Sequence, residues 1–194
     1  MNEKIKVVPV VVLENQEEAI RQLSALKEGN LLVAEITFRT AYAKDGIKFA
    51  CENFPEIYVG AGTIINETQA VEAIEAGAKF IVSPGIDEKI AKVCADNGIE
   101  YIPGCVTPTE IMKAISLNLK IVKFFPANVY GGIKAIKSLA APFKQVKFLP
   151  TGGVDENNID EYLSCDKVCA VGATYIMKGD IVANCKKIAH LLGD

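Results

Sequence analysis

The sequence predicts an α/β protein in which eight strand–helix units close into a compact, single-domain (βα)8 barrel of the TIM type over residues 1–194. Three observations support this prediction. Half of the 194 residues are apolar, which is enough to bury one sizeable core. Short apolar runs recur at intervals of about 20 to 26 residues, the length of one strand, one helix and two tight turns. Amphipathic stretches separate the runs, as expected of helices that cover a parallel sheet.

The expected strands, in chain order, are residues 7–12, 32–36, 58–59, 80–82, 101–102, 121–125, 146–149 and 169–171. Between the first two, apolar residues fall at helical spacing among charged ones, and the face expected to pack comprises Ala19, Ile20, Leu23 and Leu26. Three glycines each stand just before a new apolar run, where a helix C-cap belongs: Gly29, Gly77 and Gly98.

An open, doubly wound sheet is the alternative architecture. No GxGxxG motif follows the first apolar run, so a dinucleotide-binding version of that fold lacks its best sign. No linker, low-complexity tract or change in composition marks a second domain.

Composition excludes several classes of function. The net charge is −3 with a pI near 5.4, and the basic residues are scattered, which argues against a nucleic-acid or anionic-membrane surface. No apolar run approaches the roughly 20 residues of a membrane span, and the first residues lack a signal-peptide pattern. We therefore expect a cytoplasmic protein. Six dispersed cysteines indicate reduced thiols, and a single histidine, His190, excludes a two-histidine metal centre, so no metal is expected.

One lysine lies inside an apolar run that ends at a proline. Lys123 is flanked by Ile121-Val122 and Phe124-Phe125, ahead of Pro126. Burial disfavours the ammonium form, and a neutral amine can attack a carbonyl to form a Schiff base. The alternative is a lysine at a strand end whose head group reaches water.

Polar residues follow several of the expected strands, where a barrel builds its active site. Alternation along the second strand places Glu35, Thr37 and Arg39 on one side, although a surface ion pair would give the same pattern. The third strand runs into a glycine turn that ends at Thr63, and Pro84 follows the fourth strand as a rigid corner. Cys105 is interpreted as a packed thiol, because no histidine is available to activate it.

Glycine turns follow the seventh and eighth strands, where barrels often bind phosphate. The seventh strand runs into Thr151-Gly152-Gly153, ahead of a helix expected to begin near Asn157. The eighth runs into Gly172-Ala173-Thr174. Both turns could present backbone N–H groups to an anion.

Taken together in this order, five motifs at strand ends resemble the 2-keto-3-deoxy-6-phosphogluconate (KDPG) and 4-hydroxy-2-oxoglutarate (KHG) aldolase family over nearly the entire chain. The motifs are Glu35-Ile36-Thr37-Phe38-Arg39, Gly60-Ala61-Gly62-Thr63, Ser83-Pro84-Gly85, Lys123-Phe124-Phe125-Pro126-Ala127 and Thr151-Gly152-Gly153. The resemblance implies a homotrimeric class I aldolase without metal or other cofactor, which splits a 2-keto-3-deoxy sugar acid phosphate into pyruvate and glyceraldehyde 3-phosphate.

The resemblance also implies a role for each matching residue. Lys123 would form the Schiff base, and Glu35 would be the general acid and base, acting through a water. Arg39 and Thr63 would hold the substrate carboxylate, and Pro84 and Thr151 would line the pocket. The phosphate would be held by Gly152, Gly153, Gly172, Ala173 and Thr174, with Thr174 standing where relatives often carry serine.

Three points stay open from the sequence. A sugar-phosphate isomerase or epimerase could use Glu35 as base on the same barrel, and a phosphosugar-binding protein could keep the pocket without turnover. The substrate could be of phosphogluconate, phosphogalactonate or hydroxy-oxoglutarate type. The first strand begins within a few residues of Met1, so we expect no N-terminal helix of the kind that covers the barrel bottom in several family members.

Overall fold

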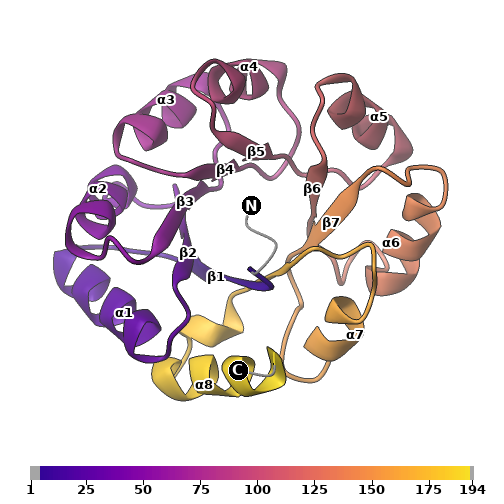
Figure 1. Cartoon of the computed structure of the whole chain (residues 1–194). Helices are drawn as coiled ribbons and strands as arrows, with labels where there is room; N and C mark the ends of the chain where they lie inside the picture. Colours follow the sequence, from indigo (N-terminus) through magenta and orange to yellow (C-terminus); the bar gives the residue numbers. More distant parts are fainter. Residues whose placement is uncertain (1–4, 193–194) are drawn as a thin grey trace.

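The computed structural model describes residues 5–192 and shows a ring of parallel strands surrounded by helices (Figure 1). The strands are β1 (Val7–Val11), β2 (Val33–Thr37), β3 (Tyr58–Gly62), β4 (Phe80–Val82), β5 (Glu100–Ile102), β6 (Ile121–Phe124), β7 (Lys147–Pro150) and β8 (Val171–Ala173). The helices are α1 (Gln16–Glu28), α2 (Ala43–Asn53), α3 (Glu67–Glu75), α4 (Glu88–Asp96), α5 (Pro108–Ser116), α6 (Gly132–Ala140), α7 (Ile159–Leu163) and α8 (Ile181–Leu192), with a 3-10 turn η1 (Tyr175–Met177) before α8. The expectation about an N-terminal helix concerns residues 1–4, which lie outside the described residues.

The strands close into a barrel, which rules out the open doubly wound sheet. Six strands pair in the order β5-β4-β3-β2-β1-β8, and β6 pairs with β7. Single bridges join these two groups, Gly104 with Lys123 on one side and Thr151 with Gly172 on the other. The predicted (βα)8 barrel is therefore confirmed, and every strand points its carboxyl end to the same face.

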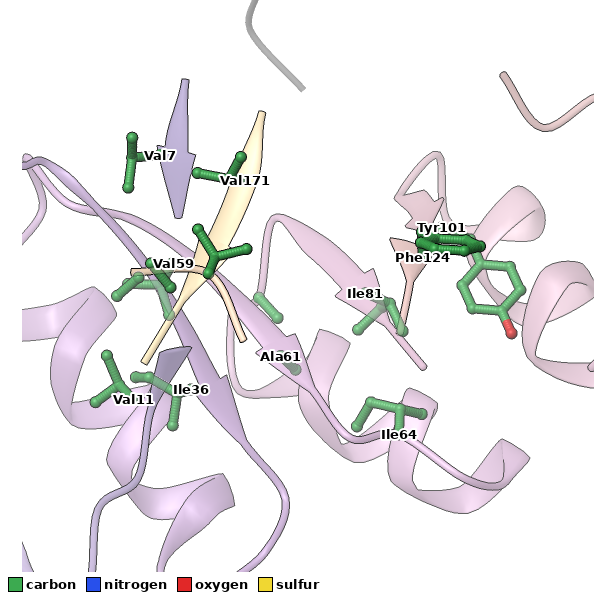
Figure 2. Packing of buried hydrophobic residues seen from close by; sticks show 14 of the residues in the cluster. Val7, Val11, Ile36, Val59, Ala61, Ile64, Ile81, Tyr101, Phe124 and Val171 are labelled. Carbon is green, nitrogen blue, oxygen red and sulfur yellow. The ribbon is translucent and has the colours of Figure 1, made fainter. Parts of the chain in front are cut away.

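Side chains alternate between the inside of the barrel and the helical layer. A small inner cluster includes Val33 of β2, whereas Ala34 and Ile36 belong to the larger cluster between strands and helices. Figure 2 shows part of this outer cluster. Because the period of a strand is two residues, Glu35 shares the inner side with Val33, and Lys123 shares it with Ile121. This alternation places the two charged groups inside the barrel.

The expected packing face of α1 was wrong in part, and the start of α7 lies within two residues of its expected position. The first helix buries Gln22 at 6% exposure, whereas Ile20 is 46% exposed, because the apolar face is centred on Ala19, Leu23 and Leu26. Helix α7 begins at Ile159, later than the expected start near Asn157, and has five residues. The residues before it form a turn in which the Asn158 side chain accepts from the Asp155 backbone N–H at 3.0 Å.

The helix ends agree with the glycine pattern. Gly29 is the C-cap of α1, and Gly77 and Gly98 directly follow the C-caps of α3 and α4 with positive φ angles of 105° and 66°. Among the described helices, none is long and apolar enough to cross a bilayer.

Candidate active site

A buried ion pair lies inside the barrel. The Nζ of Lys123, on β6, donates to Oε1 of Glu35, on β2, at 3.0 Å. The two residues are only 5% and 0% exposed. Burying both charges is costly unless they are paired and used, so this contact is the strongest sign of chemistry in the fold.

Glycines make room for the carboxylate. A Cβ on Gly62 would overlap the Glu35 carboxylate, and a Cβ on Gly60 would overlap the ring of Phe80. Residues 60–62 therefore belong to strand β3 rather than to the turn that the sequence indicated, because only glycine lets β3 lie this close to its neighbours' side chains.

Two buried polar atoms at this ion pair and at the end of β7 have no protein partner. Among the described residues, Oε2 of Glu35 and Oγ1 of Thr151 are buried and lack a hydrogen-bond partner. Thr151 directly follows β7, and its N–H donates to the Phe124 carbonyl oxygen at 3.0 Å, one residue along β6 from the lysine. Buried polar atoms without protein partners are what a site offers to water or substrate.

An aromatic ring lies beside the amine. The Nζ of Lys123 is 5.4 Å from the centroid of the Phe125 ring, which the sequence had indicated only as part of an apolar run. A ring face at this distance attracts a cation. Two features of the sequence could have indicated this contact, namely the aromatic side chain of Phe125 and its position two residues after Lys123.

Two expected carboxylate-binding residues follow β2 and β3. Strand β2 ends at Thr37, whose hydroxyl donates to the Val11 carbonyl oxygen at 3.1 Å, so it stabilises the barrel and is not free for substrate. Arg39 lies in the following turn and is exposed. Thr63 directly follows β3 with a φ angle of 58° and is half-buried. Both residues stand at the carboxyl ends of neighbouring strands.

The expected phosphate turns differ from each other. Gly152 and Gly153 form a real turn after β7, with φ angles of 90° and 75° that an L side chain rarely adopts. Gly172 and Ala173 instead belong to strand β8 and are buried, so the second turn proper begins at the exposed Thr174. Their strand conformation follows from contact with β7, since a Cβ on Gly172 would overlap the Thr151 side chain.

The remaining candidates occupy the same end of the barrel. Pro84 is exposed just after β4. Cys105 is buried, and burial raises the pKa of its thiol to about 12, which confirms the packed-thiol interpretation. Within residues 5–192, no group of three or more His, Cys, Asp or Glu side chains could hold a metal ion.

Comparison with known proteins adds independent information. The family model described as KDPG and KHG aldolase matches residues 1–191. The KHG/KDPG aldolase of Escherichia coli K12 is 41% identical over 174 residues, covering 90% of this chain and 82% of the relative. The 2-dehydro-3-deoxy-phosphogluconate aldolase of Treponema pallidum is 38% identical, covering 93% and 86%.

Solved structures show the same architecture. The KDPG aldolase of Legionella pneumophila, solved with pyruvate captured at low pH as a covalent carbinolamine, superposes with a TM-score of 0.88 at 34% identity, covering 97% of this chain and 92% of that one. The KDPG aldolase of Zymomonas mobilis ZM4, solved with 3-phosphoglycerate, gives a TM-score of 0.89 at 35% identity, covering 97% and 90%.

Proposed function

Since the chain belongs to the KDPG and KHG aldolase family, we propose that it is a class I aldolase that reversibly cleaves 2-keto-3-deoxy-6-phosphogluconate to pyruvate and glyceraldehyde 3-phosphate. 4-Hydroxy-2-oxoglutarate would be a second substrate, giving pyruvate and glyoxylate. The observation that carries the proposal is the buried 3.0 Å pair of Lys123 and Glu35 inside the barrel. The Legionella relative supports it, because that enzyme was captured with pyruvate bound covalently.

The pair provides the nucleophile and the proton carrier. Lys123 must lose a proton before its nitrogen can attack the C2 carbonyl, and Glu35 lies within hydrogen-bond distance to receive it. Attack gives a carbinolamine. The proton held by Glu35 then passes to the carbinolamine hydroxyl, which leaves as water, so the protonated imine forms and the Glu35 carboxylate is restored. The imine nitrogen accepts the electron pair of the C3–C4 bond when that bond breaks.

Glu35 then serves both halves of the cycle. Its carboxylate, acting through a water, takes the proton of the C4 hydroxyl as the aldehyde leaves, and returns a proton to C3 of the enamine. Hydrolysis of the resulting imine releases pyruvate and restores the amine. The unpartnered Oε2 supports this role, because a second oxygen is free to hold the relaying water.

Substrate orientation would come from the strand ends. We assign the keto-acid carboxylate to the Arg39 guanidinium and the Thr63 hydroxyl, which follow the adjacent strands β2 and β3. Pro84 and Thr151 would line the pocket between the two ends of the substrate. Holding the carboxylate fixes C2 beside the amine and lowers the entropic cost of reaction.

The phosphate would lie at the ends of β7 and β8. We assign it to the turn of Gly152 and Gly153 and to Gly172, Ala173 and Thr174. Because Gly172 and Ala173 are buried in strand β8, only their backbone groups would contact the phosphate. Thr174 would add an exposed hydroxyl group. The Zymomonas relative, solved with a three-carbon phosphorylated acid, supports a phosphorylated substrate.

Steady-state kinetics with matched variants test this proposal. Release of pyruvate from the phosphogluconate-type, phosphogalactonate-type and hydroxy-oxoglutarate substrates would be compared by kcat/KM, and the first should be highest. Lys123→Ala should abolish cleavage of all three. Lys120→Ala, which removes an exposed lysine just before the same strand, should leave kcat/KM within about twofold. Cleavage by Lys123→Ala at the wild-type rate would refute the proposal.

We further propose that residues 1–194 act as one domain, that the protein is cytoplasmic and that it assembles as a homotrimer. Large apolar side chains are exposed around the barrel at Ile65, Met112, Val129 and Tyr130, with Val129 reaching 71%. Such side chains are commonly covered in an oligomer. Light scattering coupled to size-exclusion chromatography should give three times the chain mass of 20.9 kDa, and the monomer mass would contradict the assembly.

A further inference from the structure

Two buried hydroxyl groups outside the catalytic pair contact each other at the end of β4. Ser83 directly follows β4, and Tyr101 is the central residue of β5; they are 2% and 3% exposed. Their oxygens are 2.7 Å apart. Figure 2 shows the Tyr101 ring packed in the outer cluster, so its hydroxyl is carried by a rigid, buried side chain.

This hydroxyl pair, Ser83 and Tyr101, holds the loop between β4 and α4 at both of its ends. The Tyr101 oxygen accepts from the Asp87 backbone N–H at 3.3 Å and lies 3.3 Å from the Gly85 carbonyl oxygen, to which Ser83 also donates. Asp87 in turn caps α4 by accepting from the Lys89 backbone N–H at 2.8 Å. Burial raises the pKa of Tyr101 to about 12, so its hydroxyl keeps its proton under ordinary conditions.

The fastened loop carries Pro84 and contacts Gly104, whose backbone pairs with Lys123. A Cβ on Gly104 would overlap the Pro84 carbonyl group, so the two backbones lie in direct contact. Gly104 forms the bridge to Lys123, and the Lys123 backbone N–H donates to the Pro103 carbonyl oxygen at 2.7 Å. The position of Pro84 relative to the amine is therefore set by backbone contacts and by the hydroxyl pair.

Sheet order places this loop beside one half of the proposed substrate. Strand β4 pairs with β3, which is followed directly by Thr63, whereas the turns assigned to phosphate follow β7 and β8. Pro84 therefore stands next to the keto-acid half, close to the atoms that would become pyruvate. A rigid wall there would limit the size of the group attached to the keto carbon.

We propose that the hydroxyl pair is a positioning element that fixes Pro84 as the wall of the keto-acid half and so selects pyruvate over 2-oxobutanoate during imine formation at Lys123. This inference rests on the proposed function. The two keto acids differ by one methyl group at C3, a difference that a hydrophobic pocket discriminates by roughly 10- to 200-fold. Discrimination of this size requires that the side chain lining the pocket keeps its position when the larger keto acid binds.

The test compares trapping of the two keto acids on the same protein sample. Wild type, Tyr101→Phe and Ser83→Ala would each be incubated with an equimolar mixture of pyruvate and 2-oxobutanoate and sodium borohydride, and the two reduced adducts on Lys123 would be quantified by mass spectrometry. We expect the ratio of pyruvate to 2-oxobutanoate adduct to fall roughly tenfold in both variants. The ratio is independent of the fraction of folded protein, so a loss of stability alone would not change it.

Tyr58→Phe is the matched control. It removes a tyrosine hydroxyl that contacts the Lys79 carbonyl oxygen at 3.4 Å and lies at the opposite end of the neighbouring strand β3. Its adduct ratio should equal that of wild type. A ratio within twofold of wild type in both Tyr101→Phe and Ser83→Ala would overturn the positioning role, and so would an equal change in Tyr58→Phe. Absence of any adduct in wild type would instead refute the proposed function.

Discussion

Replacing Lys123, the proposed Schiff-base lysine, should destabilise the fold as well as abolish activity, because it leaves a buried carboxylate without its partner. We consider Lys123→Met, which keeps an unbranched side chain of similar length and removes the charge. Glu35 is fully buried, its Oε1 would lose the 3.0 Å contact, and its Oε2 already lacks a partner among the described residues. Removing one member of a buried pair costs about 3 to 5 kcal/mol.

Protonation limits this cost. An ordinary glutamate, with a pKa of about 4.3, takes up a proton at pH 7 at a cost of about 3.7 kcal/mol. The variant should therefore lose about 3 to 4 kcal/mol of unfolding free energy at pH 7, which for a chain of this size corresponds to a fall in Tm of roughly 6 to 16 °C. The loss should shrink by about 1.4 kcal/mol for each pH unit below 7, because a neutral carboxyl group is less costly to bury.

The double variant Lys123→Met/Glu35→Leu separates charge from packing. It removes both charges, and replacing a buried ion pair by apolar side chains is often neutral or stabilising. Urea unfolding and calorimetry at pH 5 and pH 7 would measure both variants against wild type. The reasoning is refuted if Lys123→Met costs less than about 1 kcal/mol at pH 7, or if the double variant is no more stable than the single one.

Three further predictions follow from single residues. Gly62→Ala should lower kcat/KM by roughly 100-fold, because its Cβ would displace the Glu35 carboxylate. The control Gly85→Ala should keep a kcat/KM near that of wild type, because its Cβ would meet nothing within 4 Å. Equal kcat/KM values for the two variants would contradict this prediction. Gly153→Ala should raise KM for the phosphorylated substrate more than for 4-hydroxy-2-oxoglutarate, because the φ angle of 75° would be strained; a parallel rise would contradict the phosphate assignment. The free energy of unfolding should fall as the pH rises from about 9 to 12. Burial raises the pKa of Cys94, Cys105 and Tyr101 to about 12 in the folded protein, so the unfolded chain loses these protons at lower pH and is favoured. A constant free energy of unfolding over that pH range would contradict this prediction.

The spacing of apolar runs was sufficient to predict the barrel, because each strand and each helix has its own recognisable pattern of apolar residues in the sequence. Glycine-rich strand ends were harder to predict. Residues 60–62 and 172–173 look like turns, since glycine has low strand propensity. Their strand conformation depends on the Phe80, Glu35 and Thr151 side chains that occupy the space a Cβ would take, and those contacts come from other strands.

The sequence was sufficient to select Lys123 and Glu35 as candidates, but not to predict the contact between them. Lys123 was conspicuous because a charge interrupts an apolar run, and Glu35 because it lies near the end of another. Their contact joins residues 88 positions apart and depends on closure of the whole barrel. The Ser83–Tyr101 contact was missed for the same reason, because a serine before a proline and a tyrosine in a short strand carry no local sign of pairing.

The most direct test of the account is mass spectrometry after incubation with pyruvate and sodium borohydride, followed by peptide mapping. One reduced pyruvyl adduct is expected, located on Lys123 and absent from Lys123→Ala. A folded wild-type protein that forms no adduct, or that forms it on another lysine, would contradict the assignment of Lys123 as the Schiff-base residue.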